Sequence, residues 1–461
     1  MTSRREFLQQ SVAMALMPAL RSGLYHEPSG YAQPASRPRP TRAQLDWQRD
    51  ELALFCHFGV NTFTNREWGD GREDPSIFNP SALDCREWTR AAKACGAKAL
   101  ILTAKHHDGF CLWPTATTTH SVASSPFRNG QGDLVREFVD ACRADGLRPG
   151  LYLSPWDRNH PAYGDSPRYN DVYRAQLTEL LTRYGNIHEV WFDGANGEGP
   201  NGKRQQYDWP ATWSLVRRLQ PNAVMFSDAG PDVRWIGNER GVAGETNWST
   251  VRPEIVPVPG LEGAEVMRSL QQGDRDGTVW RPGETDVSIR PGWFWHPAED
   301  TKVRSADNLK QLWFTSVGRN SKLLLNVPPT SSGRFHVTDV ANLRLMRERL
   351  DARFADPVTR SARGRWAVQS DTAATLTLSL PRPVEIGAVD LREDISAGQR
   401  VAAFVLEGQT AAGWQTLVAG TTIGYRRAEP LAPVTVTALR LRITDAVERP
   451  RQVAVAAFAP V

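Results

Sequence analysis

Residues 187–194 read Ile187-His188-Glu189-Val190-Trp191-Phe192-Asp193-Gly194, an apolar run that a carboxylate and a glycine bring to an end. β-branched and aromatic residues followed by such a stop are typical of a buried strand that ends at a barrel mouth, where its last side chain enters a cleft. An aspartate fixed at that position, beside aromatic side chains that exclude water, suits a nucleophile. The alternative is that Asp193 only caps the turn after the strand.

Strand and helix patterns alternate on both sides of this segment. Strands are expected at residues 54–59, 99–103, 147–154, 223–227 and 323–326, with weaker candidates at 241–246 and 286–289. Helices are expected at residues 84–95, 133–145, 172–184, 213–219, 308–317 and 339–350. This alternation predicts a parallel sheet buried on both faces. About eight such units without a glycine-rich phosphate turn favour a (β/α)8 TIM-like barrel, distorted where the sixth and seventh strands are weak.

The pattern of apolar and polar residues changes near residue 355. Residues 356–461 alternate apolar and polar positions between glycine and proline turns, with strands expected at 374–380, 388–391, 401–406, 434–443 and 453–458. This pattern predicts a second domain, an antiparallel β-sandwich. The expected division is therefore an export signal and proline-rich tether at 1–40, a catalytic barrel at 41–355 and the sandwich at 356–461. The sandwich could stabilise the barrel or bind sugar independently.

The N-terminus carries a targeting pattern. Arg4 and Arg5 precede a short apolar run at residues 11–20, which resembles a twin-arginine export signal. We therefore expect export, most simply to the periplasm; an ordinary amphipathic first helix is the alternative. The run is too short to span a bilayer, and no other stretch approaches 18 apolar residues, so no membrane span is expected in the mature protein.

Composition excludes several partners. Lys and Arg number 55 and Asp and Glu 51, a net charge of +4 spread along the chain without a basic arm, so nucleic acid is not an expected partner. The five cysteines form no Cys-x-x-Cys pair and are odd in number. A metal cluster or a disulfide framework is therefore not expected, and small core residues are.

Polar side chains stand at the expected strand ends, which would place them on the catalytic rim of a barrel. Adjacent His106 and His107 cannot easily share a tetrahedral metal site, so no metal is expected. The histidines are then either core residues or hydrogen-bonding partners for sugar hydroxyls. The rim set is His57, His106, His107, Asp157, Asp193, Asp228 and Asn326.

Cleavage of a glycosidic bond needs a second carboxyl group, a proton donor with a raised pKa. Glu239 follows the fifth strand and lies near Trp235 and Ile236, whose apolar surroundings would keep it protonated. The alternatives for the donor are Glu67, Glu198 and Glu245.

Several motifs, in order between about residues 45 and 335, resemble glycoside hydrolase family 29, the α-L-fucosidases. These motifs are His57-Phe58-Gly59, Glu67-Trp68, Lys105-His106-His107-Asp108-Gly109-Phe110, Gly150-Leu151-Tyr152, Trp191-Phe192-Asp193-Gly194 and Leu323-Leu324-Leu325-Asn326-Val327-Pro328-Pro329.

The resemblance implies a retaining exo-α-L-fucosidase without cofactor or metal, acting on fucosylated glycans, with Asp193 as nucleophile. Residues 234–239 resemble the branch that cleaves α-1,3/1,4-linked fucose, which implies Glu239 as acid/base, and Trp293 lies in a second stretch similar to that branch. The implied substrate-binding residues are His57, Glu67, Trp68, His106, His107, Tyr152 and Trp293. The competing functions are a non-catalytic fucose- or glycan-binding protein and a different retaining glycosidase.

Overall fold

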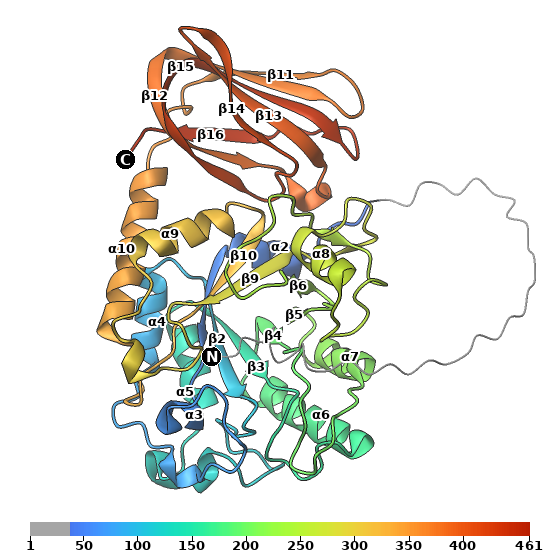
Figure 1. Ribbon diagram of the computed structural model, residues 1–461, viewed down its shortest axis with the longest axis vertical. Helices are drawn as coiled ribbons and strands as arrows, with labels where there is room; N and C mark the ends of the chain where they lie inside the picture. The colour runs from blue at the N-terminus through green and yellow to red at the C-terminus, as the bar shows by residue number, and fades with distance from the viewer. Residues whose placement is uncertain (1–36) are drawn as a thin grey trace, which may run out of the picture.

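Eight parallel strands close into a barrel in the computed structural model of the protein, which describes residues 37–461 (Figure 1). Neighbouring strands follow the order β1, β10, β9, β6, β5, β4, β3 and β2. Their bounds are β1 Leu52–Cys56, β2 Ala99–Lys105, β3 Arg148–Leu153, β4 Glu189–Trp191, β5 Val224–Ser227, β6 Val233–Trp235, β9 Gly283–Ser288 and β10 Ser321–Asn326. The predicted barrel is confirmed, and the predicted export signal lies outside the described residues.

Amphipathic helices cover the barrel. In α4, Trp88, Ala91 and Ala92 are buried on one face, and the Asp84 side chain caps the helix by accepting from the Arg86 N–H. The helices are α2 Arg42–Arg49, α3 Val60–Thr64, α4 Cys85–Ala94, α5 Leu134–Ala144, α6 Ser166–Arg183, α7 Trp209–Leu219, α8 Ala264–Gln272, α9 Ala306–Thr315 and α10 Val337–Phe354.

The sixth strand is not where the sequence pattern placed it. Residues 241–246 form no strand, and β6 is instead the three-residue segment Val233–Trp235. It follows β5 after a short turn, with no helix between them, and pairs in parallel with β5 and β9. A three-residue strand without a flanking helix leaves no periodic signal in the sequence. The prediction for strand six was therefore wrong, whereas β9 overlaps the weak candidate at 286–289.

The chain between β6 and β9 builds a loop over the barrel rim. It contains helix α8 and the two short antiparallel strands β7 Thr250–Val251 and β8 Val279–Trp280, none of which the sequence pattern predicted. Gly260, at φ +81°, comes so close to the chain that follows β4 that a Cβ built on it would lie 2.6 Å from the Gly194 carbonyl oxygen. The loop at residues 252–263 thus touches the backbone beside Asp193.

The C-terminal residues form an antiparallel sheet domain with its own apolar core, as predicted and consistent with a sandwich. Its strands are β11 Arg363–Val368, β12 Ala374–Arg392, β13 Val401–Thr410, β14 Gly413–Gly420, β15 Arg427–Ala446 and β16 Ala454–Phe458. The segments predicted separately at 374–380 and 388–391 belong to one long strand, β12, whose register shifts between them. The predicted boundary near residue 355 falls between the end of α10 and the start of β11.

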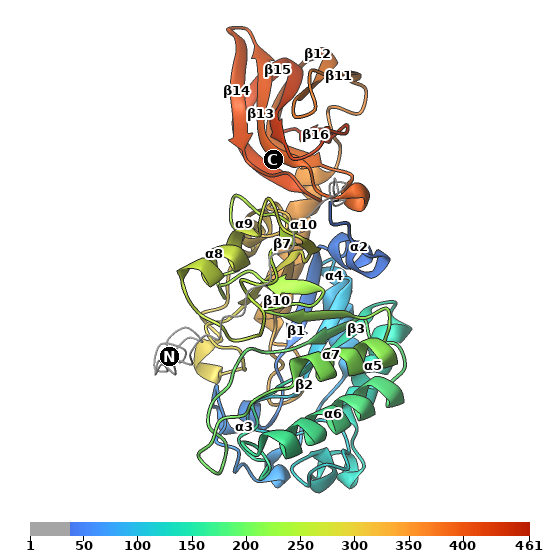
Figure 2. The same cartoon turned by 90° about the vertical axis from the view of Figure 1, so that its right-hand side faces the viewer.

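The sheet domain packs on the amino-terminal ends of the barrel strands (Figure 2). Arg426 donates to both carboxylate oxygens of Glu51, which immediately precedes β1, at 2.8 and 2.9 Å. Asn320, which immediately precedes β10, accepts from the Tyr425 N–H at 2.8 Å. The carboxyl ends of the strands, where a (β/α)8 barrel carries its active site, therefore face away from the sheet domain.

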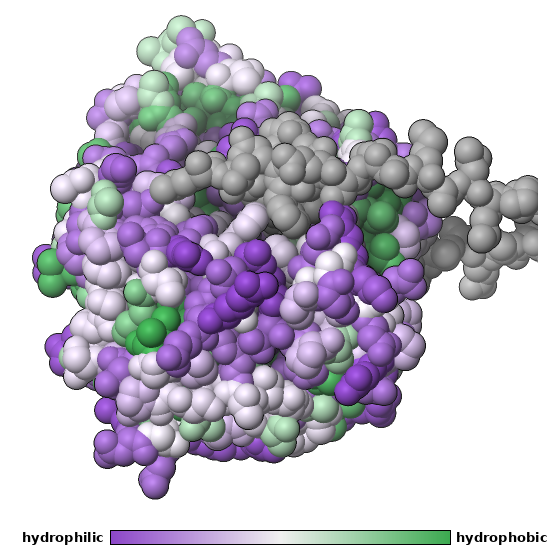
Figure 3. Space-filling view, turned by 60° about the horizontal axis from the view of Figure 1, so that its bottom comes forward, coloured by the Kyte–Doolittle hydropathy of each residue, from purple (hydrophilic) through white to green (hydrophobic). Residues whose placement is uncertain are grey.

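Two further expectations from the sequence concern the cysteines and a membrane-spanning helix. All five cysteines are buried and carry free thiols. Within residues 37–461, no helix combines the length and the apolar character that crossing a membrane requires. The surface that Figure 3 displays is mainly hydrophilic, and its apolar patches are small and separate.

Candidate active site

Asp193 stands at the carboxyl end of β4 with both oxygens engaged. The Ala195 N–H donates to Oδ1 at 2.8 Å, and the Tyr152 hydroxyl donates to Oδ2 at 3.0 Å. Nε2 of His107 lies 3.9 Å from Oδ2, and the carboxylate is 13% exposed. One oxygen therefore caps the following turn, as the alternative interpretation predicted, while the other faces a tyrosine and a histidine.

His57 is held in one protonation state. Its Nδ1 lies 2.9 Å from Oδ1 of Asn326, whose amide nitrogen donates to Ser288 Oγ and to the Trp293 carbonyl. Because the amide nitrogen is the donor, Oδ1 must accept, so Nδ1 of His57 carries the proton. Burial lowers the pKa of His57 to about 3, which keeps the ring neutral and leaves Nε2 as an acceptor.

The two adjacent histidines extend this arrangement. Nδ1 of His107 is 2.7 Å from Ser154 Oγ, whose hydroxyl in turn donates to the Trp156 carbonyl at 2.6 Å. Burial and the neighbouring histidines lower the pKa of His106 well below its usual value. Its buried Nδ1 has no hydrogen-bond partner in the described protein. Neutral imidazoles suit hydrogen bonding to an uncharged polar ligand such as a sugar hydroxyl.

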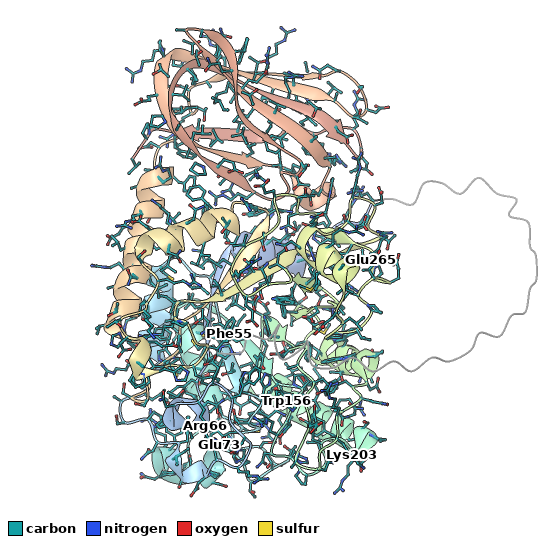
Figure 4. All side chains as sticks on the ribbon, in the orientation of Figure 1. Phe55, Arg66, Glu73, Trp156, Lys203 and Glu265 are labelled. Carbon is teal, nitrogen blue, oxygen red and sulfur yellow. The ribbon has the colours of Figure 1, made fainter. Side chains whose placement is uncertain are left out.

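Aromatic rings enclose these histidines. Trp293 lies 5.1 Å from His57 and Phe294 lies 5.0 Å from His106, measured between ring centroids. On the other side, Trp156 lies 4.9 Å from His107 and 6.1 Å from Trp68. Figure 4 shows Trp156 further from the sheet domain than Phe55, in keeping with a site at the carboxyl ends of the strands. The predicted substrate-binding residues except Glu67 are thus linked by ring contacts, and Trp156 and Phe294 are additional members that sequence reasoning missed.

Glu67 binds protein groups rather than standing alone in the site. Its carboxylate accepts from the backbone N–H groups of Trp293 and Phe294 and lies 3.0 Å from Nε2 of His296. Nδ1 of His296 is 2.8 Å from the Asn65 side-chain oxygen. The hydrogen bond with Glu67 raises the pKa of His296, because it favours the charged imidazole. Glu67 therefore fixes the segment that carries Trp293.

Glu239 is half-buried and follows β6 through Gly237, whose φ is +80°. In the barrel β5 lies between β4 and β6, so the strands that carry Asp193 and Glu239 are two spacings, or about 10 Å, apart. Side chains from such strands can face each other across a ligand. Asp193 and Glu239 leave the same rim of the barrel.

The rival acids have other surroundings. Glu245 is 77% exposed, pairs with Arg319 at 3.5 Å and accepts through its backbone carbonyl from Arg427 of the sheet domain. Glu198 is exposed, although its carbonyl accepts from the Trp156 indole. Neither side chain is enclosed by apolar residues, because both are exposed.

Two other carboxylates of the predicted rim set hold the structure together. Asp157 is buried and lies 3.0 Å from Nζ of Lys105, which also donates to Tyr169 and Gln176. Asp228 accepts from the Gly260 N–H at 3.1 Å and so ties down the loop at 252–263.

Strand β9 supports the site from inside the barrel. Glu284 accepts from the Trp191 indole at 3.0 Å, and Asp286 accepts from the Trp235 indole at 2.7 Å. Ser288 accepts from Asn326, the partner of His57. Alternate residues of one strand thereby hold the strands that precede Asp193 and Glu239. The Glu-x-Asp-x-Ser alternation at 284–288 was the available signal, and it was missed because polar side chains were not expected inside a barrel.

A buried charge cluster lies below Trp191. Nζ of Lys322 is 2.9 Å from Glu189 and 3.8 Å from Glu284, and all three side chains are 0% exposed. Burial and the Glu189 carboxylate raise the pKa of Glu284 well above its usual value. A cluster of one cation and two carboxyl groups has no net charge only if one of the carboxyl groups keeps its proton. Glu284 is the carboxyl group that keeps it.

Residues 37–461 contain no group of three or more His, Cys, Asp or Glu side chains arranged to hold a metal ion.

Comparison with known proteins agrees with this geometry. Residues 26–352 match the family model described as Alpha-L-fucosidase. The chain is 44% identical over 418 residues to Alpha-L-fucosidase 1 of Arabidopsis thaliana, covering 85% of this chain and 81% of that protein. A crystal structure of a glycoside hydrolase 29 family member from an unknown rumen bacterium is 42% identical, with a TM-score of 0.85 over 92% of this chain and 78% of that chain. A structure of a Ruminococcus gnavus GH29 fucosidase in complex with fucose is 29% identical, with a TM-score of 0.83 over 94% of this chain and 97% of that chain.

The matched region contains the whole barrel and every residue of the site described above. The chain is therefore a member of the α-L-fucosidase family of glycoside hydrolases, family 29.

Proposed function

We propose that the protein is a retaining exo-α-L-fucosidase that removes terminal α-L-fucose from oligosaccharides or glycoconjugates. The observation that carries the proposal is the orientation of Asp193, whose Oδ1 is held by a backbone N–H while Oδ2 faces Tyr152 and His107. A carboxylate fixed in this way among neutral histidines and aromatic rings is suited to attack a bound sugar.

In this mechanism Oδ2 of Asp193 attacks the anomeric carbon while Glu239 protonates the leaving oxygen. Glu239, now a carboxylate, then removes a proton from water, and the water displaces Asp193 to release fucose with its configuration retained. The two carboxyl groups of a retaining site stand about 5–5.5 Å apart when the sugar is bound.

Recognition of fucose rests on polar contacts more than on its methyl group. Burying one methyl against Trp68 or Trp293 contributes only about 1 kcal/mol. Nε2 of His57, the acceptor nitrogen, would accept a hydrogen bond from a sugar hydroxyl. A site built to pair with each hydroxyl discriminates strongly against a sugar that lacks one, because its own buried groups are then left unpaired.

The nucleophile is tested by Asp193→Gly. We expect hydrolysis of an aryl α-L-fucoside to fall by about 10⁴-fold or more. Asp157→Asn is unsuitable as a control because Asp157 is structural; Asp140→Asn, an exposed carboxylate on α5, should keep full activity. Near-native turnover by Asp193→Gly would show that another group attacks the sugar.

The acid/base is tested by Glu239→Ala with azide. An activated aryl fucoside needs no proton donor, and azide can replace the deprotonated water, so azide should partly restore turnover and give a fucosyl azide of retained configuration. Glu245→Ala is the matched control, because that acid is exposed and lies beside the sheet domain. Loss of activity in Glu245→Ala with no rescue of Glu239→Ala would reverse the assignment.

We also propose a preference for α-1,3/1,4-linked fucose, supported by the likeness of residues 234–239 to that branch. Lewis-type oligosaccharides and 2′-fucosyllactose should be digested side by side, with released fucose measured. Faster release from 2′-fucosyllactose would contradict the preference without affecting the assignment of the acids.

Export to the periplasm through a twin-arginine signal is the proposed localisation. In a Gram-negative host, substitution of Arg4 and Arg5 by lysine should move fucosidase activity from the periplasmic to the cytoplasmic fraction. An unchanged distribution would refute this route.

A further inference from the structure

One face of the sheet domain carries a groove that the fucosidase reaction does not use. Register aligns Arg365 of β11, Thr377 of β12 and Arg440 of β15 in one row across the sheet. The next row on the same face places Thr375 of β12 opposite Arg442 of β15. These side chains line a hollow of about 410 Å³ together with Ala367 and Gln369. Figure 1 shows these strands at the end of the molecule furthest from the barrel.

The groove owes its shape to the size of the side chains. Threonines of β12 form the floor, and arginines of β11 and β15 form the two walls. Because β12 separates these strands, the walls start two strand spacings, or about 10 Å, apart. That width admits a single extended chain, and the sheet leaves its two ends open.

The groove is positively charged. Glu407 of β13 is paired with Arg440 at 2.6 Å and lies 3.5 Å from Arg442, so it offsets one of the three arginines. Arg365 is exposed and makes no ion pair or side-chain hydrogen bond within residues 37–461. The lining residues include no acid and no aromatic ring. The exposed Trp414 ring beside the groove is covered by the Arg440 guanidinium, which lies 4.2 Å from its centroid. An anionic chain with hydroxyl groups matches this surface, whereas a single-stranded nucleic acid would find no ring among the lining residues on which to stack.

We propose that this groove binds an acidic polysaccharide through its carboxylate or sulfate groups. Arg365 and Arg442 pair with anionic groups from opposite walls, and the Thr375 and Thr377 hydroxyls contact the sugar rings between them. Because the barrel mouth faces away from the sheet domain, a glycan held here leaves the mouth open. Binding would raise the effective concentration of neighbouring fucosylated branches at the catalytic site.

The test is affinity electrophoresis of the full chain in gels that contain alginate, dextran sulfate or neutral dextran. We expect retardation by alginate, by dextran sulfate or by both, weakening as salt is added, and none by neutral dextran. The two anionic gels distinguish carboxylate from sulfate as the recognised group. The double variant Arg365→Ser/Arg442→Ser should bind about tenfold or more weakly, since each arginine contributes a charge-assisted contact.

Arg449→Ser is the matched control, because Arg449 is exposed in the same domain but lies outside the groove. It should bind the polysaccharide like the native chain, and all variants should hydrolyse a small aryl fucoside at the native rate. The proposal is overturned if the native chain is not retarded in either anionic gel, or if Arg449→Ser weakens binding as much as the double variant. Equal retention by single-stranded DNA, lost in the same double variant, would also overturn it and indicate an unselective polyanion surface.

Discussion

The histidines of the site matter through their protonation state. The sequence predicted His57, His106 and His107 as site residues, but not that burial and Asn326, 269 positions away, would fix His57 as a neutral ring with Nε2 as acceptor. That state depends on contacts between strands that no local pattern encodes. The Trp156 and Phe294 rings were missed for the same reason.

Acid should therefore destabilise the protein steeply. The folded pKa values of His57, about 3, and of His106 lie below the ordinary value of about 6.5. Their stabilisation is complete above about pH 6.5 and is lost as pH falls towards the folded pKa, because only the unfolded chain takes up the protons. For each histidine, the free energy of unfolding should fall by about 1.4 kcal/mol per unit decrease in pH over this range. Urea unfolding between pH 6 and pH 4 should show a shallower slope for His106→Gln; an unchanged slope would contradict the assignment.

The Glu284 side chain gives a second prediction. Its raised folded pKa means that stability falls as pH rises above about 4.5, since the unfolded chain ionises there and the folded one does not. Glu284→Gln mimics the protonated acid and should be at least as stable as the native chain at pH 8, with near-native turnover. Glu189→Gln removes the ionised partner of Lys322 and should cost about 3 kcal/mol or more. Equal losses in the two variants, measured by denaturant unfolding, would show that Glu284 is ionised.

At the scale of elements, the parts that follow the strand–helix alternation could be predicted and the irregular parts could not. The strands β1, β2 and β10 were found because each contains an unbroken apolar run, at residues 52–56, 99–102 and 323–325. β6 was placed wrongly, because it is three residues long and lacks a helix before it. β9 gave a weak signal because Glu284, Asp286 and Ser288 point into the barrel, where they hold neighbouring strands instead of packing as apolar core.

The hydrogen bonds that hold the segment carrying Trp293 should weaken as the pH rises. His296 donates from both ring nitrogens, to Asn65 and to Glu67, only while it is protonated, and its folded pKa is raised. This stabilisation is complete below about pH 6.5 and is lost as pH rises through the folded pKa. The KM for an aryl fucoside should therefore rise on the alkaline side more than kcat falls. His296→Gln should have a raised KM that no longer depends on pH there; a pH-dependent KM in this variant would refute the role.

At the scale of the whole molecule, the sheet domain stabilises the closed end of the barrel. Arg426 bridges Glu51 of the barrel and Asp390 of the sheet domain, and its guanidinium lies 4.5 Å from the Trp313 ring. The sequence predicted both domains but not this contact, because its partners lie hundreds of positions apart.

Arg426→Ala should destabilise the protein by about 3 kcal/mol, because two partly buried carboxylates, Glu51 and Asp390, are then left with only the more exposed Arg392 between them. Arg275→Ala is a matched control, since Arg275 also pairs across the domains, with Asp445 at 2.6 Å, but both side chains are substantially exposed. That pair should contribute less than about 1 kcal/mol. Chemical unfolding of both variants measures the difference, and similar losses would show that Arg426 has no special part in the interface.

The near-contact between Gly260 and Gly194 has a mechanical consequence. There is no space for even one methyl group between the loop at residues 252–263 and the backbone that follows Asp193. Any side chain larger than glycine at position 260 would have to displace either the loop at residues 252–263 or the backbone next to Asp193, so the size of this one residue decides how closely the loop can approach Gly194.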